Sequence, residues 1–119
     1  MNTATRPITL LICAMGGEGG GVLMNWIVDA ATTQGLPVQS TSVPGVAQRT
    51  GATTYYIELF PVPLMELCRR EPILSLYPSI GDIDLVVASE LIEIGRAMER
   101  GFVSPDRTIL IGSSHRVYS

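Results

Sequence analysis

Apolar positions along the chain fall into two patterns, short continuous runs and segments with helical spacing. Residues 7–14 (PITLLICA) form an apolar run bounded by proline and glycine, which is typical of a buried parallel strand. Residues 82–89 (DIDLVVAS) and 107–112 (RTILIG) each contain a shorter apolar run, and we expect a strand in each. Between residues 22 and 34 the apolar residues recur at helical spacing instead, and Gly35 is well placed to end that helix.

The remaining segments complete an alternating order. Residues 37–43 and 52–60 are rich in β-forming side chains and predict a second and a third strand. Their connection is shorter than the dozen or so residues that a parallel crossover needs, so we expect these two strands to be antiparallel. We expect a short helix near 64–70, and a longer helix over 90–102 with Ser89 as its N-cap.

The resulting order is strand, helix, strand, strand, short helix, strand, helix, strand. This order predicts an α/β fold, a Rossmann-like three-layer sandwich with a mixed but mostly parallel sheet. At 119 residues the chain is expected to be one domain, over residues 1–119.

Composition narrows the function classes. Only 16% of the residues are charged, against 46% apolar, which indicates strands buried on both faces or a surface that partners cover. The net charge is -3 and the only arginine pair is Arg69-Arg70, so the sequence argues against nucleic-acid binding. No apolar stretch is long enough for a membrane helix. The apolar run after Arg6 lacks a small residue before Cys13 and an A-x-A-like site, so we expect a strand, not a signal peptide, and a cytoplasmic protein.

The connection between the first strand and the first helix is almost all glycine. Such a loop can present main-chain N–H groups and a helix N-terminus to an anion. It is not a dinucleotide fingerprint, because a G-x-G-x-x-G pattern starting at Gly17 ends on Val22, and the P-loop lysine is missing. The alternative is that the glycines only let the helix pack closely on the strand. The candidate contact residues in this loop are Gly16, Gly17, Glu18, Gly19, Gly20 and Gly21.

A second candidate loop follows the second strand. It carries Gln48 and Arg49 between Gly45 and Gly51. An amide and a guanidinium on a glycine-flanked turn suit a carboxylate or a phosphate, and we take Gln48, Arg49 and Gly51 as candidate binding residues. The alternative is a solvated arginine in an ordinary connection.

Four stretches together resemble a known family. GGEGGGVL, PVQSTSVPGVAQRTGATTYYIELFP, DLVVASELIEIGRA and SSHRVYS are similar to the gamma-type domain of 2-oxoacid:ferredoxin oxidoreductases, and most similar to the indolepyruvate ferredoxin oxidoreductase beta subunit. The most specific element is the Q-R-x-G motif at residues 48–51, and the resemblance extends from residue 8 onward.

The resemblance implies a role inside a larger enzyme. These enzymes decarboxylate a 2-oxoacid on thiamine diphosphate, pass electrons through iron–sulfur clusters to ferredoxin and transfer the acyl group to coenzyme A. The indolepyruvate branch acts on aryl pyruvates. The gamma-type domain packs against the thiamine-binding domains and is associated with the coenzyme A side of the site.

The sequence lacks the residues that would bind thiamine diphosphate or an iron–sulfur cluster, which places this chemistry on a partner chain. In GDID (81–84), Ile83 stands where the thiamine motif has glycine, and no paired asparagines follow. Cys13 and Cys68 are too few for a cluster or a metal site, and we expect Cys13 to be buried. We therefore expect no cofactor, metal or catalytic residue on this chain alone, which would be inactive without a thiamine- and ferredoxin-type subunit.

Three further expectations complete the interpretation. Because ligands of open α/β sheets bind at the carboxyl ends of strands, we expect Ser89-Glu90 and His115-Arg116 to converge with the two loops, although His115 could equally be an exposed tail residue. The family domain runs on beyond residue 119, which predicts an N-terminal fragment or a short homologue with uncovered surface that favours a homo-oligomer. The alternative functions are a free-standing nucleotide- or phosphate-binding module without enzymatic activity, and a purely structural protein.

Overall fold

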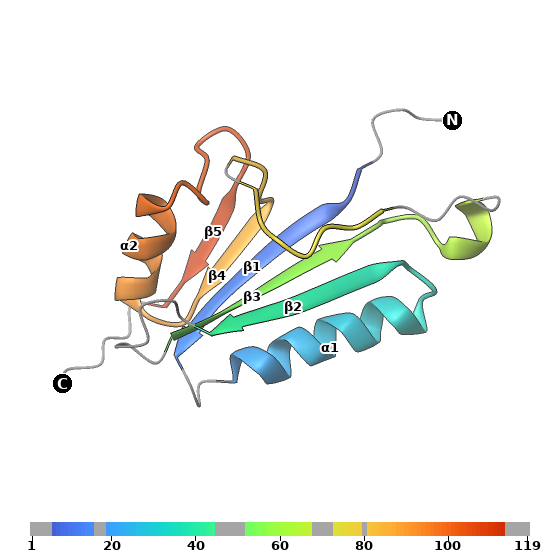
Figure 1. The fold of residues 1–119 in the computed structure, drawn as a ribbon, viewed down its shortest axis with the longest axis horizontal. Helices are drawn as coiled ribbons and strands as arrows, with labels where there is room; N and C mark the ends of the chain where they lie inside the picture. Colours follow the sequence, from blue (N-terminus) through green and yellow to red (C-terminus); the bar gives the residue numbers. More distant parts are fainter. Residues whose placement is uncertain (1–5, 16–18, 45–51, 68–72, 80, 114–119) are drawn as a thin grey trace.

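Within the described residues, five strands and two α-helices follow one another in the predicted order (Figure 1). The structure is a computed structural model that describes residues 6–15, 19–44, 52–67, 73–79 and 81–113. Its elements are β1 (Ile8–Met15), α1 (Gly20–Thr33), β2 (Val38–Pro44), β3 (Ala52–Leu59), the 3-10 helix η1 (Leu64–Leu67), β4 (Leu85–Ala88), α2 (Leu91–Glu99) and β5 (Ile109–Gly112). The short helix expected near 64–70 is thus a 3-10 turn in its described part.

The strands form one mixed sheet in the order β2-β3-β1-β4-β5. β1 pairs with β4 and β4 with β5 in parallel, whereas β3 is antiparallel to both β1 and β2. The antiparallel pairing of the second and third strands is confirmed. β3 runs against the other four strands, so the carboxyl ends of β1, β2, β4 and β5 lie at one edge of the sheet (Figure 1).

The two helices cover opposite faces of the sheet. On β1, Leu11 and Cys13 belong to the buried cluster that packs with α2, whereas Ile12 and Ala14 belong to the cluster under α1. This is the period-2 alternation of a strand buried on both sides. The Rossmann-like three-layer α/β fold is confirmed, and so is the buried position of Cys13.

The two neighbouring tyrosines of β3 both pack against a core cluster. Alternation along a strand places Tyr55 and Tyr56 on opposite faces of the sheet. Tyr56 is 2% exposed in the α2-side cluster, but Tyr55 packs against the α1-side cluster. Both tyrosines are held by the fold, because a three-layer sandwich has a core on each face of its sheet.

The helices begin or end next to glycines with positive φ, and neither helix start has a side-chain capping hydrogen bond. α1 begins at Gly20, two residues earlier than expected, after Gly19 with φ 84°. It ends where expected, since Gly35 has φ 74° and its N–H bonds to the carbonyl of Thr32 at 3.0 Å. α2 is shorter than expected and ends at Glu99, before Gly101 with φ 80°.

The expected N-cap of the second helix was wrong. Glu90, not Ser89, is the N-cap of α2, and its side chain makes no capping hydrogen bond. Glu90 has extended backbone dihedrals, φ -141° and ψ 155°. The chain therefore remains extended for one residue beyond Ser89, although serine is a preferred N-cap residue.

Candidate functional site

The carboxyl edge of the sheet gathers the sequence-predicted residues that the structure describes. β1 ends at Met15, shortly before Gly19 and the start of α1. β4 ends at Ala88, next to Ser89 and Glu90 at the start of α2. The amide of Ser89 donates to the carbonyl of Cys13 at 3.0 Å, which ties these two strand ends together. Both helices therefore begin at the carboxyl ends of the parallel strands, which is where ligands bind in open α/β sheets.

The described glycines at this edge have different physical reasons. Gly19 takes a left-handed conformation that other residues adopt at a cost, and no atom of the described residues lies within 4 Å of an added Cβ. At Gly20, an added Cβ would lie 2.7 Å from the ring of Tyr55 and 2.8 Å from the Cβ of Ala14. At Gly21 the nearest atom, the Tyr55 hydroxyl oxygen, would be at an ordinary 3.5 Å. Close packing of helix on strand thus accounts for Gly20 alone among the three.

The start of α1 is also open to an anion. It has no side-chain cap and no acidic residue in its first turn. The first N–H groups of a helix lack intrahelical acceptors and carry the positive end of the helix dipole. The start of α1 can therefore present its main-chain N–H groups to an anion, as the sequence predicted. Contact with a ligand stays a prediction.

Several candidates lie outside the described residues, namely Gly16, Gly17, Glu18, Gln48, Arg49, Gly51, His115 and Arg116. The residues that flank the two loops are described. In the sheet register Met15 pairs with Ala52, and Pro44 pairs with Thr53. The glycine loop and the Gln48-Arg49 loop therefore leave the sheet at the same edge.

Two buried acidic residues follow β4. Glu90 is 3% exposed, and its Oε1 atom is buried without a hydrogen-bond partner among the described residues. Glu93 is 4% exposed and pairs with Arg96 at 2.8 Å. Burial first, and then the charge of Glu93, raise the pKa of the Cys13 thiol to about 11, with Arg100 acting in the opposite direction. Cys13 is consequently an inert thiol at neutral pH, not a nucleophile.

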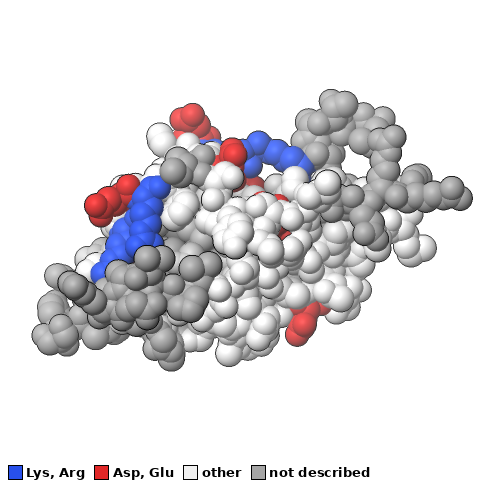
Figure 2. Space-filling model, in the orientation of Figure 1, with Lys and Arg blue, Asp and Glu red and all other residues white. Residues whose placement is uncertain are grey.

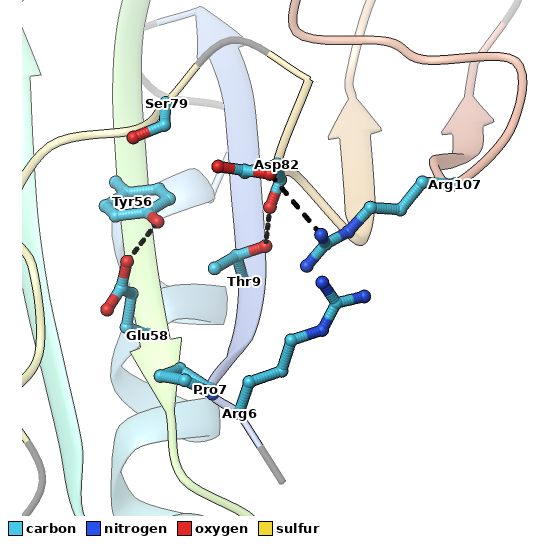
Figure 3. A pocket seen from close by; sticks show the side chains of 8 residues that line it. All are labelled: Arg6, Pro7, Thr9, Tyr56, Glu58, Ser79, Asp82 and Arg107. Atoms are coloured by element: carbon cyan, nitrogen blue, oxygen red, sulfur yellow. Dashed lines mark hydrogen bonds and ion pairs between the residues drawn. The ribbon is translucent and has the colours of Figure 1, made fainter. Parts of the chain in front are cut away.

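The opposite edge holds a polar pocket that the sequence analysis did not single out (Figure 3). It has a volume of about 200 Å³. It is lined by Arg6, Pro7, Thr9, Tyr56, Glu58, Ser79, Asp82 and Arg107. The available signals were Thr9 inside an apolar run and the alternate positions 56 and 58 on β3, which place a phenol and a carboxylate on one face.

One network in this pocket ties the start of β1 to the segment before β4. The hydroxyl of Thr9 donates to the carbonyl of Asp82 at 2.6 Å, and the amide of Thr9 donates to Asp84 Oδ2 at 2.9 Å. Arg107 Nε lies 2.8 Å from Asp84 Oδ1. Burial would raise the pKa of Asp84, but the bonds from Arg107 and Thr9 and the Arg107 charge outweigh it and hold that pKa below its ordinary value.

A second network in the pocket anchors the segment that crosses β3. The Tyr56 hydroxyl donates to Glu58 Oε2 at 2.5 Å, and the amide of Ser75 donates to Glu58 Oε1 at 2.7 Å. Burial foremost, and then the hydrogen bond to Glu58, raise the pKa of Tyr56 far above its ordinary value. Because each oxygen of Glu58 has a partner within the protein, we interpret this edge as structural.

No group of three or more histidine, cysteine, aspartate or glutamate side chains within the described residues is placed to hold a metal ion. None of the helices in the described part of the chain is long and apolar enough to cross a membrane.

The family model for pyruvate ferredoxin/flavodoxin oxidoreductase matches residues 9–117. The chain therefore belongs to this family of oxidoreductases, and the family-level part of the sequence resemblance is confirmed.

A solved structure extends the comparison. The fold is similar to that of a 2-oxoglutarate:ferredoxin oxidoreductase from Magnetococcus marinus with 2-oxoglutarate, coenzyme A and succinyl-CoA bound, with a TM-score of 0.61 and 15% sequence identity. The match covers 88% of this chain and 16% of that chain, so the present chain corresponds to a small part of that protein. At this identity the likeness supports the fold alone. A comparison with curated protein sequences found no match.

Proposed function

We propose that this chain is a site-completing and assembly domain of an indolepyruvate-type 2-oxoacid:ferredoxin oxidoreductase, which converts aryl 2-oxoacids to acyl-CoA. A partner chain carries the thiamine and iron–sulfur chemistry, and this chain has no catalytic residue of its own. The observation that carries the proposal is the family match over residues 9–117 on a chain that lacks the ligands for either redox cofactor.

Two of the family's cofactors do not fit this chain. A cluster needs about four cysteine thiolates, and the sequence has two cysteines, of which Cys13 is buried with a raised pKa. Thiamine diphosphate is held through a divalent cation, and the described residues offer no cluster of metal ligands. No reaction step is therefore assigned to this chain.

Coenzyme A fits the carboxyl edge better, because its phosphates are anions. The uncapped start of α1, without acidic residues in its first turn, suits a phosphate group. When bound, coenzyme A supplies the thiol that accepts the acyl group. The role of this chain is to orient that carrier at residues 16–21 and at Gln48, Arg49 and Gly51.

The surface also suits a protein partner. Charged side chains lie mostly toward the upper and left margins of Figure 2, and a broad middle area carries none. On α1, Val22 and Trp26 are one turn apart and are 51% and 68% exposed, and Met98 on α2 is 56% exposed. Large apolar side chains on a surface poor in charge are characteristic of protein interfaces.

The proposal is tested by reconstitution. The chain is co-expressed with a thiamine- and ferredoxin-type subunit of the same family and purified anaerobically. We expect the complex to reduce a viologen dye in the presence of coenzyme A and indolepyruvate, with weaker turnover of pyruvate and 2-oxoglutarate. We expect the chain alone to be colourless and inactive. A flavin or iron–sulfur spectrum on the isolated chain would overturn the division of labour, and a preference for pyruvate would overturn only the indolepyruvate assignment.

A matched pair of glycine variants tests the role of the carboxyl edge. Gly19 and Gly35 stand at the two ends of α1 and have φ 84° and 74°, and at both an added Cβ would meet no atom of the described segments within 4 Å. Replacing either by alanine should cost about 1 kcal/mol in folding free energy. Only Gly19→Ala should raise the KM for coenzyme A in the complex. Equal effects of Gly19→Ala and Gly35→Ala on that KM would contradict a binding role for the glycine loop.

The open start of α1 also keeps the second candidate, a free-standing nucleotide- or phosphate-binding module. That function predicts a thermal shift of the isolated chain with ATP, NAD or FMN that Gly19→Ala removes and Gly35→Ala preserves. No shift across this panel would remove the candidate.

A further inference from the structure

The polar pocket at the amino edge is lined by charged side chains whose charges cancel. Arg6 and Arg107 are positive, and Glu58 and Asp82 are negative. The pocket has a volume of about 200 Å³, whereas one molecule of liquid water takes about 30 Å³. Pockets for drug-sized ligands start at about 300 Å³. The volume therefore suits a small organic molecule of a few non-hydrogen atoms.

Two of these four charged groups already have good partners inside the protein. Both carboxylate oxygens of Glu58 accept hydrogen bonds, one from the Tyr56 hydroxyl and one from the Ser75 amide. The Nε atom of Arg107 donates to Asp84 Oδ1 at 2.8 Å. These contacts belong to the two networks described above, so the fold itself accounts for Glu58 and Arg107.

The other two charged groups, Arg6 and Asp82, are incompletely paired. Arg6 is exposed and forms no ion pair or hydrogen bond with the described part of the chain. The side chain of Asp82 is 65% exposed, and its ion pair with Arg107 Nη1 is long, at 3.4 Å. No ion pair among the described residues joins Arg6 to Asp82, although both line the same pocket (Figure 3). The pocket thus contains a guanidinium and a carboxylate with a space between them.

We propose that this pocket binds a small α-amino acid, with its carboxylate on Arg6 and its ammonium group on Asp82. A guanidinium takes a carboxylate through two parallel hydrogen bonds, and an ammonium group donates hydrogen bonds to a carboxylate. In an α-amino acid a single carbon atom joins the two charged groups, so one small molecule satisfies both residues. This proposal does not depend on the proposed function.

A ligand with a single charge fits the pocket less well. An anion on Arg6 would share the pocket with the carboxylates of Glu58 and Asp82. A cation on Asp82 would share it with the guanidinium groups of Arg6 and Arg107. Like charges at such short range repel, whereas a zwitterion adds no net charge to a pocket whose lining is balanced.

The position of the pocket determines what binding would do to the domain. Arg6 precedes β1 and Asp82 precedes β4, and these two strands are parallel neighbours. The bound molecule would therefore link the starts of two strands that the Thr9 hydroxyl already joins. The glycine loop lies at the opposite edge of the sheet, so the two sites do not compete for one ligand.

Titration of the ¹⁵N-labelled chain with L-alanine, followed by NMR, tests the proposal. The amides of Thr9 and Ser75 report on the pocket, because they donate to Asp84 and Glu58. We expect saturable shifts of these two signals with a Kd of about 1 mM, and no shift of Gly21 at the carboxyl edge. No saturable shift up to about 50 mM L-alanine would overturn the proposal.

Two matched compounds separate a zwitterion site from a site for one ion. Propionate is L-alanine without its ammonium group, and ethylamine is L-alanine without its carboxylate. We expect each of them, alone or in an equal mixture, to bind at least about tenfold more weakly than L-alanine, because each lacks one charged contact. Equal binding of propionate would indicate a plain anion site, and equal binding of ethylamine a plain cation site. Either result would overturn the proposal.

Two variants of the pocket test the two contacts separately. Arg6→Gln should remove the advantage of L-alanine over ethylamine, and Asp82→Asn should remove its advantage over propionate. Arg100→Gln and Asp29→Asn are the matched controls, because they make the same changes of charge at exposed residues outside the pocket. Both controls should leave the Kd for L-alanine unchanged.

Dispersed amide signals like those of the unaltered chain establish that each variant is folded. Unchanged L-alanine binding in Arg6→Gln and Asp82→Asn, or equal losses in the pocket variants and the controls, would show that these two side chains do not hold the ligand.

Discussion

Two buried glutamates at opposite edges of the sheet have opposite surroundings. Glu58, near the amino ends of the parallel strands, is 8% exposed and receives hydrogen bonds on both carboxylate oxygens. Glu90, at the carboxyl edge, is 3% exposed, and its Oε1 atom finds no hydrogen-bond partner in the part of the chain that the structure describes. Polar groups that find partners inside the chain hold the fold together, whereas a buried group without one is a cost that a fold keeps for another reason.

The same contrast holds for the backbone. At the amino edge Thr9, Asp84 and Arg107 form a closed network of hydrogen bonds. At the carboxyl edge α1 starts without a side-chain cap. We infer that the amino edge stabilises the domain and that the carboxyl edge serves what binds to it.

Among the variants that test this difference between the two edges, we expect Asp84→Ala to have the largest effect on stability. Asp84→Ala removes the acceptor of the Thr9 amide and the ion-pair partner of Arg107, and should cost about 3 kcal/mol in the free energy of unfolding. Urea denaturation followed by circular dichroism measures it. Asp106→Ala, at an exposed acidic residue, is the control and should change stability by less than about 0.5 kcal/mol. Similar losses in both variants would show that the network is not a stabilising feature.

Asp84 also predicts a direction for pH dependence. Its folded-state pKa lies below the ordinary value of 3.8, so its contribution is fully present above that value and is lost as the pH falls through the folded pKa. The stability difference between the unaltered chain and Asp84→Ala should therefore shrink as the pH is lowered from 5 toward about 2. A difference that stays constant with pH would contradict the lowered pKa.

A smaller effect is expected from one substitution made at both glutamates. Glu58→Leu leaves the Tyr56 hydroxyl and the Ser75 amide without their acceptor and should cost about 2 kcal/mol. Glu90→Leu removes an unsatisfied buried oxygen, so the isolated chain should lose nothing or gain up to about 1 kcal/mol. Thermal unfolding of the two variants compares them directly. A large loss in Glu90→Leu would remove the distinction between the two edges.

The smallest difference in stability is expected between alanine variants of two adjacent glycines at the carboxyl edge. Gly20→Ala forces a methyl group against the Tyr55 ring and Ala14 and should cost about 1 to 2 kcal/mol. Gly21→Ala meets only ordinary contacts in the same helical turn and should be neutral or stabilise by up to about 1 kcal/mol. Chemical denaturation resolves a difference of this size. Equal values would mean that Tyr55 and Ala14 move aside freely.

The element order was predictable because it depends on local patterns. The continuous apolar run of β1, the helical spacing before Gly35 and the short connection between β2 and β3 each indicated the observed structure. The cap of α2 was not predictable, because serine and glutamate are neighbours there and the backbone of Glu90 remains extended. The packing of Tyr55 depends on a helix lying over that face, which alternation along one strand does not reveal.

The candidate site was predictable only in its location. Glycine content and the strand–loop–helix order directed attention to the carboxyl edge, and the register of Met15 with Ala52 brings the flanks of both loops there. The polar networks at the other edge were missed because Thr9 and Asp84 are 75 residues apart in sequence. No local pattern connects groups at that separation.

The sequence by itself determined the class of fold, the family and the absence of cluster ligands, because periodicity, motif spacing and residue counts are local or additive properties. Only the tertiary structure decided which polar groups are satisfied, since a hydrogen bond between distant segments exists only after the strands have taken their order and register.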